Sequence, residues 1–259
     1  MITSQGARYA IHAQSLFLKA FGRIPLKPKR MPLWMPHCVV ATGGCNFTNI
    51  YDELFCQELY ESPKPLPAAP RIVDVGGHLG LASLYFLSRY PDCSLTAIEP
   101  NPSLAALLRE NLSAWPKRAK VIEAALSLYT GTTEFNVTAD NAFTVTGGIE
   151  NREAPERAIS KLTVPCIDAR EVLAEPVDLL KLDVEGHEYR LLPLALFEPS
   201  HIKNMVIEFH DLDERRSEFD AITQLLVRER GYRIANSDNV ELSDSALRAL
   251  SGSVIIKLY

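Results

Sequence analysis

The 259-residue chain has few cysteines, and they are not grouped. The five cysteines are widely scattered and include no Cys-x-x-Cys pair, which argues against a disulfide framework and against a zinc knuckle. No run approaches the ~20 apolar residues of a membrane-spanning helix, and the N-terminus lacks the apolar core and cleavage site of a secretory signal. We therefore expect a cytoplasmic protein without a transmembrane segment.

Acidic residues are missing from the first 51 positions, which hold six Lys or Arg residues. The rest of the chain holds 21 basic and 32 acidic residues, a net charge of −11 within an overall charge of −5. Because nucleic-acid binding needs clustered positive charge, we do not expect this acidic body to bind nucleic acid. Two interpretations of the basic segment stay open. Residues 1–30 either contact anionic lipid at a membrane surface, or form a lid or homodimer-packing helix whose charges are solvated.

The N-terminal part of the chain is interrupted by proline. Residues 7–22 show a moderately amphipathic helical pattern, and helical spacing returns over 51–60. A proline-rich segment at 62–70 then precedes the first strong strand pattern. We therefore predict an N-terminal extension, lid or linker over residues 1–70 and one domain over residues 71–259.

From the start of this domain, short apolar runs alternate with helical patterns. Nearly continuous apolar strands separated by helices are typical of a parallel sheet covered on both faces. We predict a doubly wound, Rossmann-like α/β sheet that is mostly parallel. The last run follows another strand candidate without a strong helix between them, so an antiparallel closing strand is expected. The expected strands are 71–76, 94–99, 120–125, 177–183, 203–209, 231–235 and 253–259, and the expected helices lie near 80–89, 102–114, 187–197 and 215–230.

A glycine-rich turn follows the first of these strands. Ligands of a doubly wound sheet bind beyond the carboxyl ends of its strands, and glycine lets the backbone turn tightly and approach a ligand closely. The spacing Asp-x-Gly-x-x-x-Gly is the methyltransferase form and differs from the Gly-x-Gly-x-x-Gly turn of dehydrogenases. Asp74 is expected to orient the ammonium end of S-adenosylmethionine, directly or through the loop. The cofactor residues predicted in this turn are Asp74, Gly76, Gly77, His78 and Gly80.

The second strand ends in an acidic residue, Glu99, roughly 20 residues after the glycine turn. An acidic side chain at this place accepts hydrogen bonds from ribose hydroxyls. Pro100 and Asn101 follow directly and are included in the predicted cofactor site. At the end of the third strand, Glu123 or Ala124 is expected near the adenine ring.

Four segments of the chain resemble the FkbM-type S-adenosylmethionine-dependent methyltransferases, which are commonly O-methyltransferases of natural products and saccharides. The resemblance covers about residues 51–259, and its most specific part is the pattern Lys-x-Asp-x-Glu-Gly-x-Glu. One departure is Gly77-His78, where the family usually has Ala-Asn. The resemblance implies S-adenosylmethionine as cofactor and a small-molecule or glycan acceptor. The four segments are Ile72–Leu81, Ala97–Pro102, Leu179–Glu188 and Val206–His210.

Polar residues at the ends of the fourth and fifth strands are expected to converge beside the cofactor. Asp183 and Glu185 follow one strand, and Glu208 and His210 end the other. Methyl transfer to a hydroxyl needs alignment and a base. His210 is the leading base because an imidazole with a pKa near ~6.5 accepts a proton at neutral pH, with Glu208 orienting it. Asp183 or Glu185 is the competing base, and Asp183 is also included among the cofactor residues.

The same cluster of carboxylates and imidazole suits a divalent metal that lowers the pKa of an acceptor hydroxyl. Asp183, Glu208 and His210 are the candidate ligands, although nothing in their spacing requires a metal. His187 and Glu188 are expected to begin the next helix and to face solvent.

The sequence leaves several functions open. O-methylation of a hydroxyl on a saccharide, glycolipid or natural product comes first. N-methylation of an amine or protein side chain and a non-catalytic S-adenosylmethionine-binding regulator are the alternatives, and the loop spacing disfavours an NAD-dependent dehydrogenase. No recognisable sequence motif identifies the acceptor pocket. The polar loop at 138–160, with Gly147-Gly148 as a hinge, either closes over substrate or is a disordered surface loop.

Overall fold

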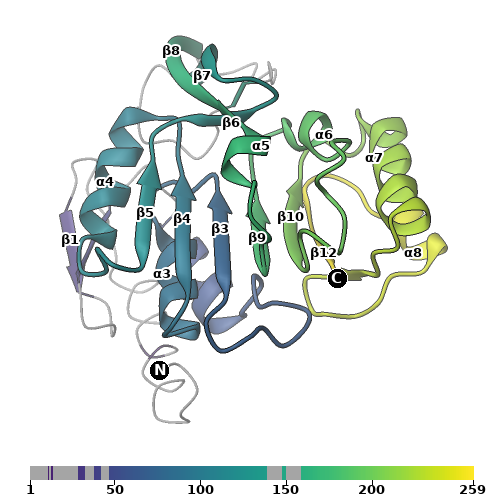
Figure 1. Ribbon diagram of the computed structural model, residues 1–259, viewed down its shortest axis with the longest axis horizontal. Helices are drawn as coiled ribbons and strands as arrows, with labels where there is room; N and C mark the ends of the chain where they lie inside the picture. The colour runs from purple at the N-terminus through teal and green to yellow at the C-terminus, as the bar shows by residue number, and fades with distance from the viewer. Residues whose placement is uncertain are drawn as a thin grey trace.

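A central sheet of seven strands forms the body of the molecule. The computed structural model describes residues 11, 13, 29–32, 38–41, 47–138, 148–149 and 159–259. The strand order is β11-β12-β10-β9-β3-β4-β5 (Figure 1). The strands from β5 to β10 run parallel, and β12 is antiparallel to both of its neighbours. The predicted mostly parallel sheet with an antiparallel closing strand is therefore confirmed. The strands are β3 (Arg71–Val75), β4 (Ser94–Ile98), β5 (Ala119–Ile122), β9 (Leu179–Leu182), β10 (Met205–Phe209), β11 (Ile234–Asn236) and β12 (Val254–Leu258).

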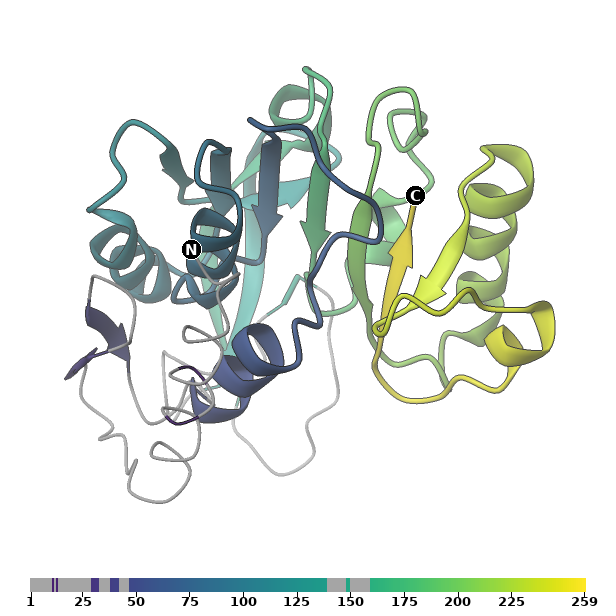
Figure 2. The same ribbon diagram turned by 90° about the horizontal axis from the view of Figure 1, so that it is seen from below.

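The apolar residues of the strands are shared between two hydrophobic cores. Ile72 of β3 belongs to one core and its neighbour Val73 to the other, as expected when successive side chains point to opposite faces of a sheet. Helices cover both faces (Figures 1 and 2). Burial of the strands on both sides explains why their sequences are nearly continuous apolar runs.

The helices largely occupy the expected places. They are α3 (Leu81–Arg89), α4 (Pro102–Leu112), α5 (Ala169–Val172), α6 (Glu188–Leu191), α7 (Arg216–Thr223), the π-helical η2 (Gln224–Glu229) and α8 (Asp244–Arg248). The short helices α5 and α8 were not predicted, and two predicted helices have other bounds or geometry. The helix expected at 187–197 is only the short α6 followed by turns, and the one expected at 215–230 continues from α7 into a π-helix.

A small second sheet was not predicted. The expected strand at 120–125 is interrupted at Glu123, so that β5 ends at Ile122 and a new strand, β6 (Ala125–Ser127), begins. β6 pairs with β8 (Ile159–Asp168), which in turn pairs with β7 (Gly131–Thr138) in the order β6-β8-β7. This sheet lies beside the carboxyl ends of the parallel strands (Figure 1). It therefore adds a wall to the ligand edge.

The polar loop expected at 138–160 is mostly outside the described residues. β7 extends to Thr138 and β8 begins at Ile159. Between them, Gly148 exchanges two backbone hydrogen bonds with Asn136, at 2.9 and 3.2 Å. Gly147, the other half of the proposed hinge, is not described.

The N-terminal elements include a strand pair, β1 (Lys29–Pro32) and β2 (Cys38–Ala41), and the helical segments α2 (Phe47–Tyr51) and η1 (Asp52–Cys56). The helix expected over 7–22 lies outside the described residues except at positions 11 and 13. The helical spacing predicted over 51–60 corresponds to η1 and the end of α2. Its aromatic side chains pack against α3, where the rings of Phe55 and Tyr85 meet edge to face at 5.7 Å.

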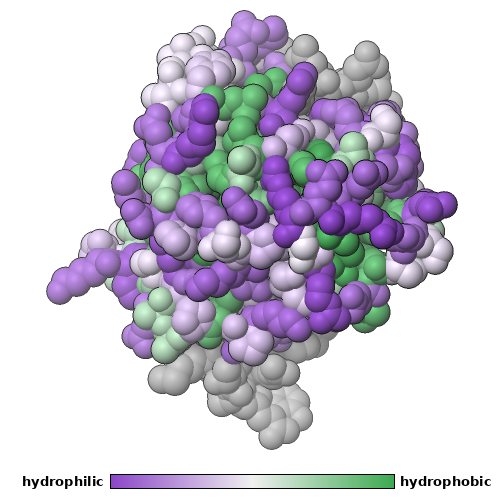
Figure 3. All heavy atoms as spheres, turned by 45° about the vertical axis from the view of Figure 1, so that its right-hand side comes forward, coloured by the Kyte–Doolittle hydropathy of each residue, from purple (hydrophilic) through white to green (hydrophobic). Residues whose placement is uncertain are grey.

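Hydrophilic side chains dominate the face shown in Figure 3, with smaller hydrophobic areas between them. No helix in the described part of the chain is long and apolar enough to cross a bilayer. Large hydrophobic side chains that are exposed among the described residues are Leu128, Tyr129, Leu162 and Val240.

Candidate active site

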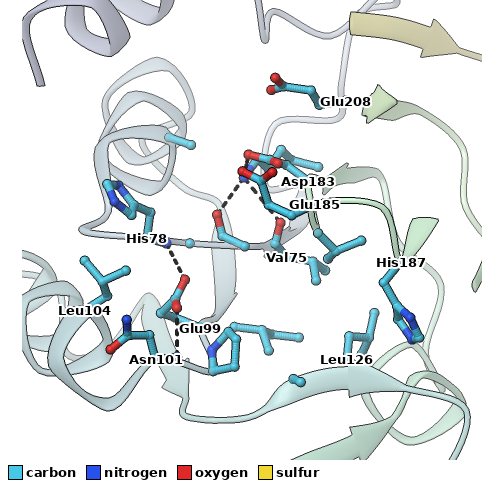
Figure 4. A pocket seen from close by; sticks show the side chains of 18 of the residues that line it. Val75, His78, Glu99, Asn101, Leu104, Leu126, Asp183, Glu185, His187 and Glu208 are labelled. Carbon is cyan, nitrogen blue, oxygen red and sulfur yellow. Dashed lines mark hydrogen bonds and ion pairs between the residues drawn. The ribbon is translucent and has the colours of Figure 1, made fainter. Parts of the chain in front are cut away.

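A cavity of about 340 Å³ lies at the carboxyl ends of the parallel strands. The ends of β3, β4, β9 and β10 supply one side, and the small sheet and the N-terminal helical segments supply the others. Figure 4 shows Glu99 on one side of this space and the carboxylates of Asp183, Glu185 and Glu208 on another. The cavity thus lies where a doubly wound sheet binds its ligands.

The glycine turn forms part of the cavity wall. The N–H groups of Gly76 and Gly77 both donate to the carbonyl oxygen of Ile98, at 3.0 and 2.9 Å, which ties the turn to the end of β4. Gly76 has φ of +78°, and a Cβ at this position would lie 1.8 Å from the carbonyl oxygen of Asp183. Position 76 therefore requires glycine for its backbone angle and for its close approach to β9. Gly80 begins α3 with φ of +98° and does not line the cavity.

Asp74 lies beneath this turn and does not line the cavity. Its carboxylate is completely buried, accepts a 2.6 Å hydrogen bond from the Ser83 hydroxyl and lies 3.5 Å from Lys181 Nζ. Burial raises the pKa of Asp74, while Lys181 and Ser83 oppose the rise. Of the two roles predicted for Asp74, the geometry supports the indirect one, through the loop.

Lys181 connects the turn to the acidic end of the cavity. It pairs with Asp74 across β3 and β9, and its Nζ donates to the carbonyl oxygen of Gly76 at 2.7 Å and lies 3.2 Å from Asp183 Oδ2. Burial opposes the charge of Lys181, but Asp183 and Asp74 outweigh burial and raise its pKa. The cation therefore stays charged and fixes both the turn and Asp183.

Glu99 is buried at the end of β4 and lines the cavity. Its Oε2 accepts from the His78 N–H and its Oε1 from the Asn101 N–H, both at 2.9 Å. Burial raises the pKa of Glu99 to about 7, although these two hydrogen bonds oppose the rise. The Asn101 side chain accepts from the Ser103 N–H at 3.0 Å and so caps α4. Glu99 is thereby held rigidly, with lone pairs left for a ligand.

The two residues predicted near adenine at the end of the third strand differ in their position. Ala124 lines the cavity together with Ala125, Leu126 and Phe135 of the small sheet. Glu123 instead pairs with Arg109 at 2.6 Å and does not line the cavity. Of the two residues predicted near the adenine ring, Ala124 lies in the cavity wall and Glu123 does not.

The four polar residues at the ends of β9 and β10 converge as the sequence predicts. His210 Nε2 lies 3.6 Å from Glu185 Oε2, 3.7 Å from Glu208 Oε1 and 3.8 Å from Asp183 Oδ1. The three carboxylates line the cavity, whereas His210 lies behind them and does not. Burial raises the pKa of Glu208, and the nearby Asp183 adds to the rise. Burial also acts to raise the pKa of Asp183, but Lys181 and His210 bring it below its usual value.

The expectation that Glu188 faces solvent is wrong. Glu188 is completely buried, and its Oε1 accepts from the backbone N–H of His210 at 2.8 Å and lies 3.3 Å from His210 Nδ1. Glu188 rather than Glu208 therefore orients the imidazole. Burial acts to lower the pKa of His210, but Glu188, Asp183 and Glu185 raise it to about 9. His187, also expected in solvent, is buried and lines the cavity.

Comparison with known proteins gives the family. Residues 74–234 match the methyltransferase FkbM domain. The chain belongs to this family.

Individual relatives differ in how much they share with the chain. Methyltransferase sdnD of Sordaria araneosa is 29% identical over 71% of this chain and 82% of its own length. The tRNA1(Val) (adenine(37)-N6)-methyltransferase of Aeromonas hydrophila is 33% identical, but over 42% of this chain and 47% of its own length. The solved structure of methyltransferase FkbM from Methylobacillus flagellatus KT matches 83% of this chain and 54% of its own with a TM-score of 0.47 and 14% identity.

Several residues lining the cavity of this FkbM methyltransferase were missed from its sequence. Tyr60 donates from its hydroxyl to Glu208 Oε2 at 3.2 Å, and its ring lies 5.8 Å from Lys181 Nζ. The sequence shows helical spacing over 51–60, but nothing in it marks Tyr60 as a residue of the site. Other missed residues include Ile50, Glu53, Leu104, Phe135, Ile149 and the buried Lys181.

Proposed function

We propose that this FkbM methyltransferase uses S-adenosylmethionine to methylate a hydroxyl group of a saccharide, glycolipid or natural-product small molecule. The observation that carries the proposal is the single cavity lined by both Glu99 and the carboxylates of Asp183, Glu185 and Glu208. A donor bound along Glu99 and the glycine turn would present its methyl group toward these carboxylates. S-adenosylmethionine supplies a methyl group on a sulfonium, which leaves as a neutral thioether when a nucleophile attacks in line.

The residues present fit this donor. Glu99 keeps lone pairs for ribose hydroxyls after accepting two backbone hydrogen bonds. Gly76 and Gly77 leave room beside the turn, and the apolar wall of Ala124 and Leu126 suits a flat adenine ring. The negative charge of the cavity favours the positively charged sulfonium and ammonium.

Glu208 is our candidate for the base that takes the proton of the acceptor hydroxyl. It lines the cavity, its side chain is 29% exposed, and Tyr60 holds one of its oxygens. Asp183 is engaged by Lys181 at 3.2 Å, and His210 lies behind the carboxylates. A base must reach the proton that it removes, so these contacts favour Glu208 over Asp183 and His210, and the greater exposure of Glu208 favours it over Glu185, which is 17% exposed.

Transfer of an isotope-labelled methyl group tests the proposal. The protein is incubated with methyl-labelled S-adenosylmethionine and a cell extract separated into small-molecule, RNA and protein fractions. We expect label in the small-molecule fraction, in a product that carries one added methyl group on an oxygen atom. No transfer to any fraction would contradict a methyltransferase activity on these acceptors.

N-methylation is the second candidate, and one observation favours it. The 33% identity to an adenine-N6-methyltransferase covers 42% of this chain and includes a nitrogen acceptor in that protein's name. Label that appears in the RNA fraction and is released by ribonuclease would support this candidate. Label in the protein fraction would instead indicate a side-chain acceptor.

A further inference from the structure

We propose that Asp183, Glu185 and His210 form a binding site for a divalent transition-metal cation of the Mn²⁺, Fe²⁺ or Zn²⁺ class. Each residue offers one ligand atom, and these atoms all lie within 4.8 Å of one another. The inference goes beyond the proposed function, because cation binding requires neither methyl donor nor acceptor.

The distances within the cluster suit a shared ion better than direct hydrogen bonds. His210 Nε2 lies 3.6 Å from Glu185 Oε2 and 3.8 Å from Asp183 Oδ1, whereas hydrogen bonds of this kind are about 2.7–3.2 Å long. Two ligand atoms that are each about 2.1 Å from one ion, at an angle of about 110–120°, lie about 3.4–3.6 Å apart. Each of these two distances is therefore close to the separation that two ligands of one cation require.

The imidazole is aimed into this space. The side chain of His210 is 5% exposed, and its Nε2 lies at ion-pair distance, 3.6–3.8 Å, from Glu185, Glu208 and Asp183. One cation could therefore contact the imidazole together with two of these carboxylates.

The other side of the ring carries the support typical of a metal-binding histidine. Glu188 Oε1 lies 3.3 Å from His210 Nδ1, and Glu188 is itself held by the Gly186 N–H at 2.8 Å. A carboxylate at Nδ1 keeps a proton on that nitrogen, so Nε2 is the nitrogen that would bind a metal once the cation displaces its proton. The completely buried Glu188 thus fixes the orientation of the ring.

The ligand types point to the class of cation. One imidazole with two carboxylates suits Mn²⁺, Fe²⁺ or Zn²⁺, while Ca²⁺ takes 6–8 oxygen ligands. Glu208 Oε1 lies 3.7 Å from the same nitrogen, so a bound cation would also reduce repulsion among the gathered carboxylates. Because Asp183 and Glu185 line the cavity, the open positions of the ion would face the acceptor.

Titration with Mn²⁺ in the absence of S-adenosylmethionine tests the proposal. Free Mn²⁺ gives an electron paramagnetic resonance signal that decreases on binding, and we expect one ion per chain. Glu185→Gln should weaken binding at least tenfold without disturbing the Lys181 contacts, and Asp183→Asn, which also removes the charge that faces Lys181, should weaken binding by at least the same factor. Glu134→Gln changes an exposed carboxylate that pairs with Lys161 on the small sheet and should leave the affinity unchanged.

A second measurement on the unaltered protein guards against misfolded variants. Electron spin-echo modulation of bound Mn²⁺ should show coupling to a ¹⁴N nucleus of His210. Failure to bind Mn²⁺ at millimolar concentration, binding that Glu185→Gln leaves intact, or bound Mn²⁺ without nitrogen coupling would each overturn the site. These results are independent of methyl transfer, which is measured separately.

Discussion

The protonation state of the Glu99 side chain should set the affinity of the protein for the methyl donor. Its pKa is raised to about 7 by burial, so in the free protein the carboxyl is largely protonated below that pH. Ribose hydroxyls donate best to the ionised carboxylate, and donor binding below pH 7 must therefore release a proton.

We predict that the affinity for S-adenosylmethionine rises about tenfold per pH unit below 7 and levels off above it. Calorimetry between pH 5.5 and 8, in buffers of different ionisation enthalpy, measures both affinity and proton release. Glu99→Gln should bind the donor more weakly and remove the pH dependence. A variant with the same pH profile as the parent would show that Glu99 is not the titrating contact.

Glu208 and Tyr60 form a pair whose members have separable effects. Glu208→Gln removes the proposed base and should lower kcat by roughly 10²–10⁴-fold, with donor affinity changed less than threefold. Tyr60→Phe removes only the 3.2 Å hydrogen bond to Glu208 and should cost much less. Both are measured on the acceptor that takes the label, with Glu134→Gln as the surface control. An unchanged kcat in Glu208→Gln would return the role of base to His210, Asp183 or Glu185.

The cavity residues that the sequence predicts differ from those that it misses in how their positions arise. Glu99 and Asp183 are located by the chain itself, because each follows an apolar strand whose end defines the ligand edge. The burial of Glu188 comes from side-chain packing between α6 and the end of β10, and a glutamate next to a helix start ordinarily faces water. Tyr60 reaches Glu208 across 148 residues of sequence, a contact that no local pattern reveals.

At the scale of elements, the sequence predicts the parallel strands but not the small sheet. Strands buried on both faces have apolar runs that stand out, as in β3 and β9. β7 is half exposed, and its buried apolar residues are Phe135 and Val137. Its partner β8 comes after a long polar segment. Pairing at that separation leaves no periodic signal in either strand alone.

The closing strand β12 carries a buried lysine that should make the stability of the protein depend on pH. Lys257 is completely buried, donates to Asn239 Oδ1 at 3.0 Å, and has a pKa lowered to about 8 by burial. The unfolded chain, with the ordinary pKa of 10.5, binds more protons than the folded chain between these values, so stability due to Lys257 rises with pH from about 8 to 10.5.

Lys257→Met should remove this pH dependence and raise Tm at pH 7, because it no longer buries a charge. Thermal melts of both proteins at intervals from pH 7 to 10 measure the difference. We expect the two Tm curves to approach each other as pH rises. Parallel curves would mean that the lysine keeps an ordinary pKa in the folded protein.

At the scale of the whole molecule, the basic N-terminal segment has two candidate partners, which are an anionic membrane surface and a second copy of the chain. One short amphipathic helix binds membranes only marginally, so deletion of residues 1–30 should leave sedimentation with anionic vesicles unchanged. Replacement of Lys27, Lys29 and Arg30 by Gln keeps the chain length and serves as a matched charge variant. A loss of sedimentation in both proteins would instead establish a peripheral membrane contact, and size-exclusion chromatography of the same samples tests for a homodimer.

We propose that the cavity between Glu99 and Glu208 binds S-adenosylmethionine. Isothermal titration calorimetry of the full chain with S-adenosylmethionine and, separately, with NAD tests it most directly. We predict a 1:1 heat of binding with S-adenosylmethionine that Glu99→Gln strongly reduces, and no heat with NAD. Binding of NAD alone would contradict the assignment of the glycine turn and the function built on it.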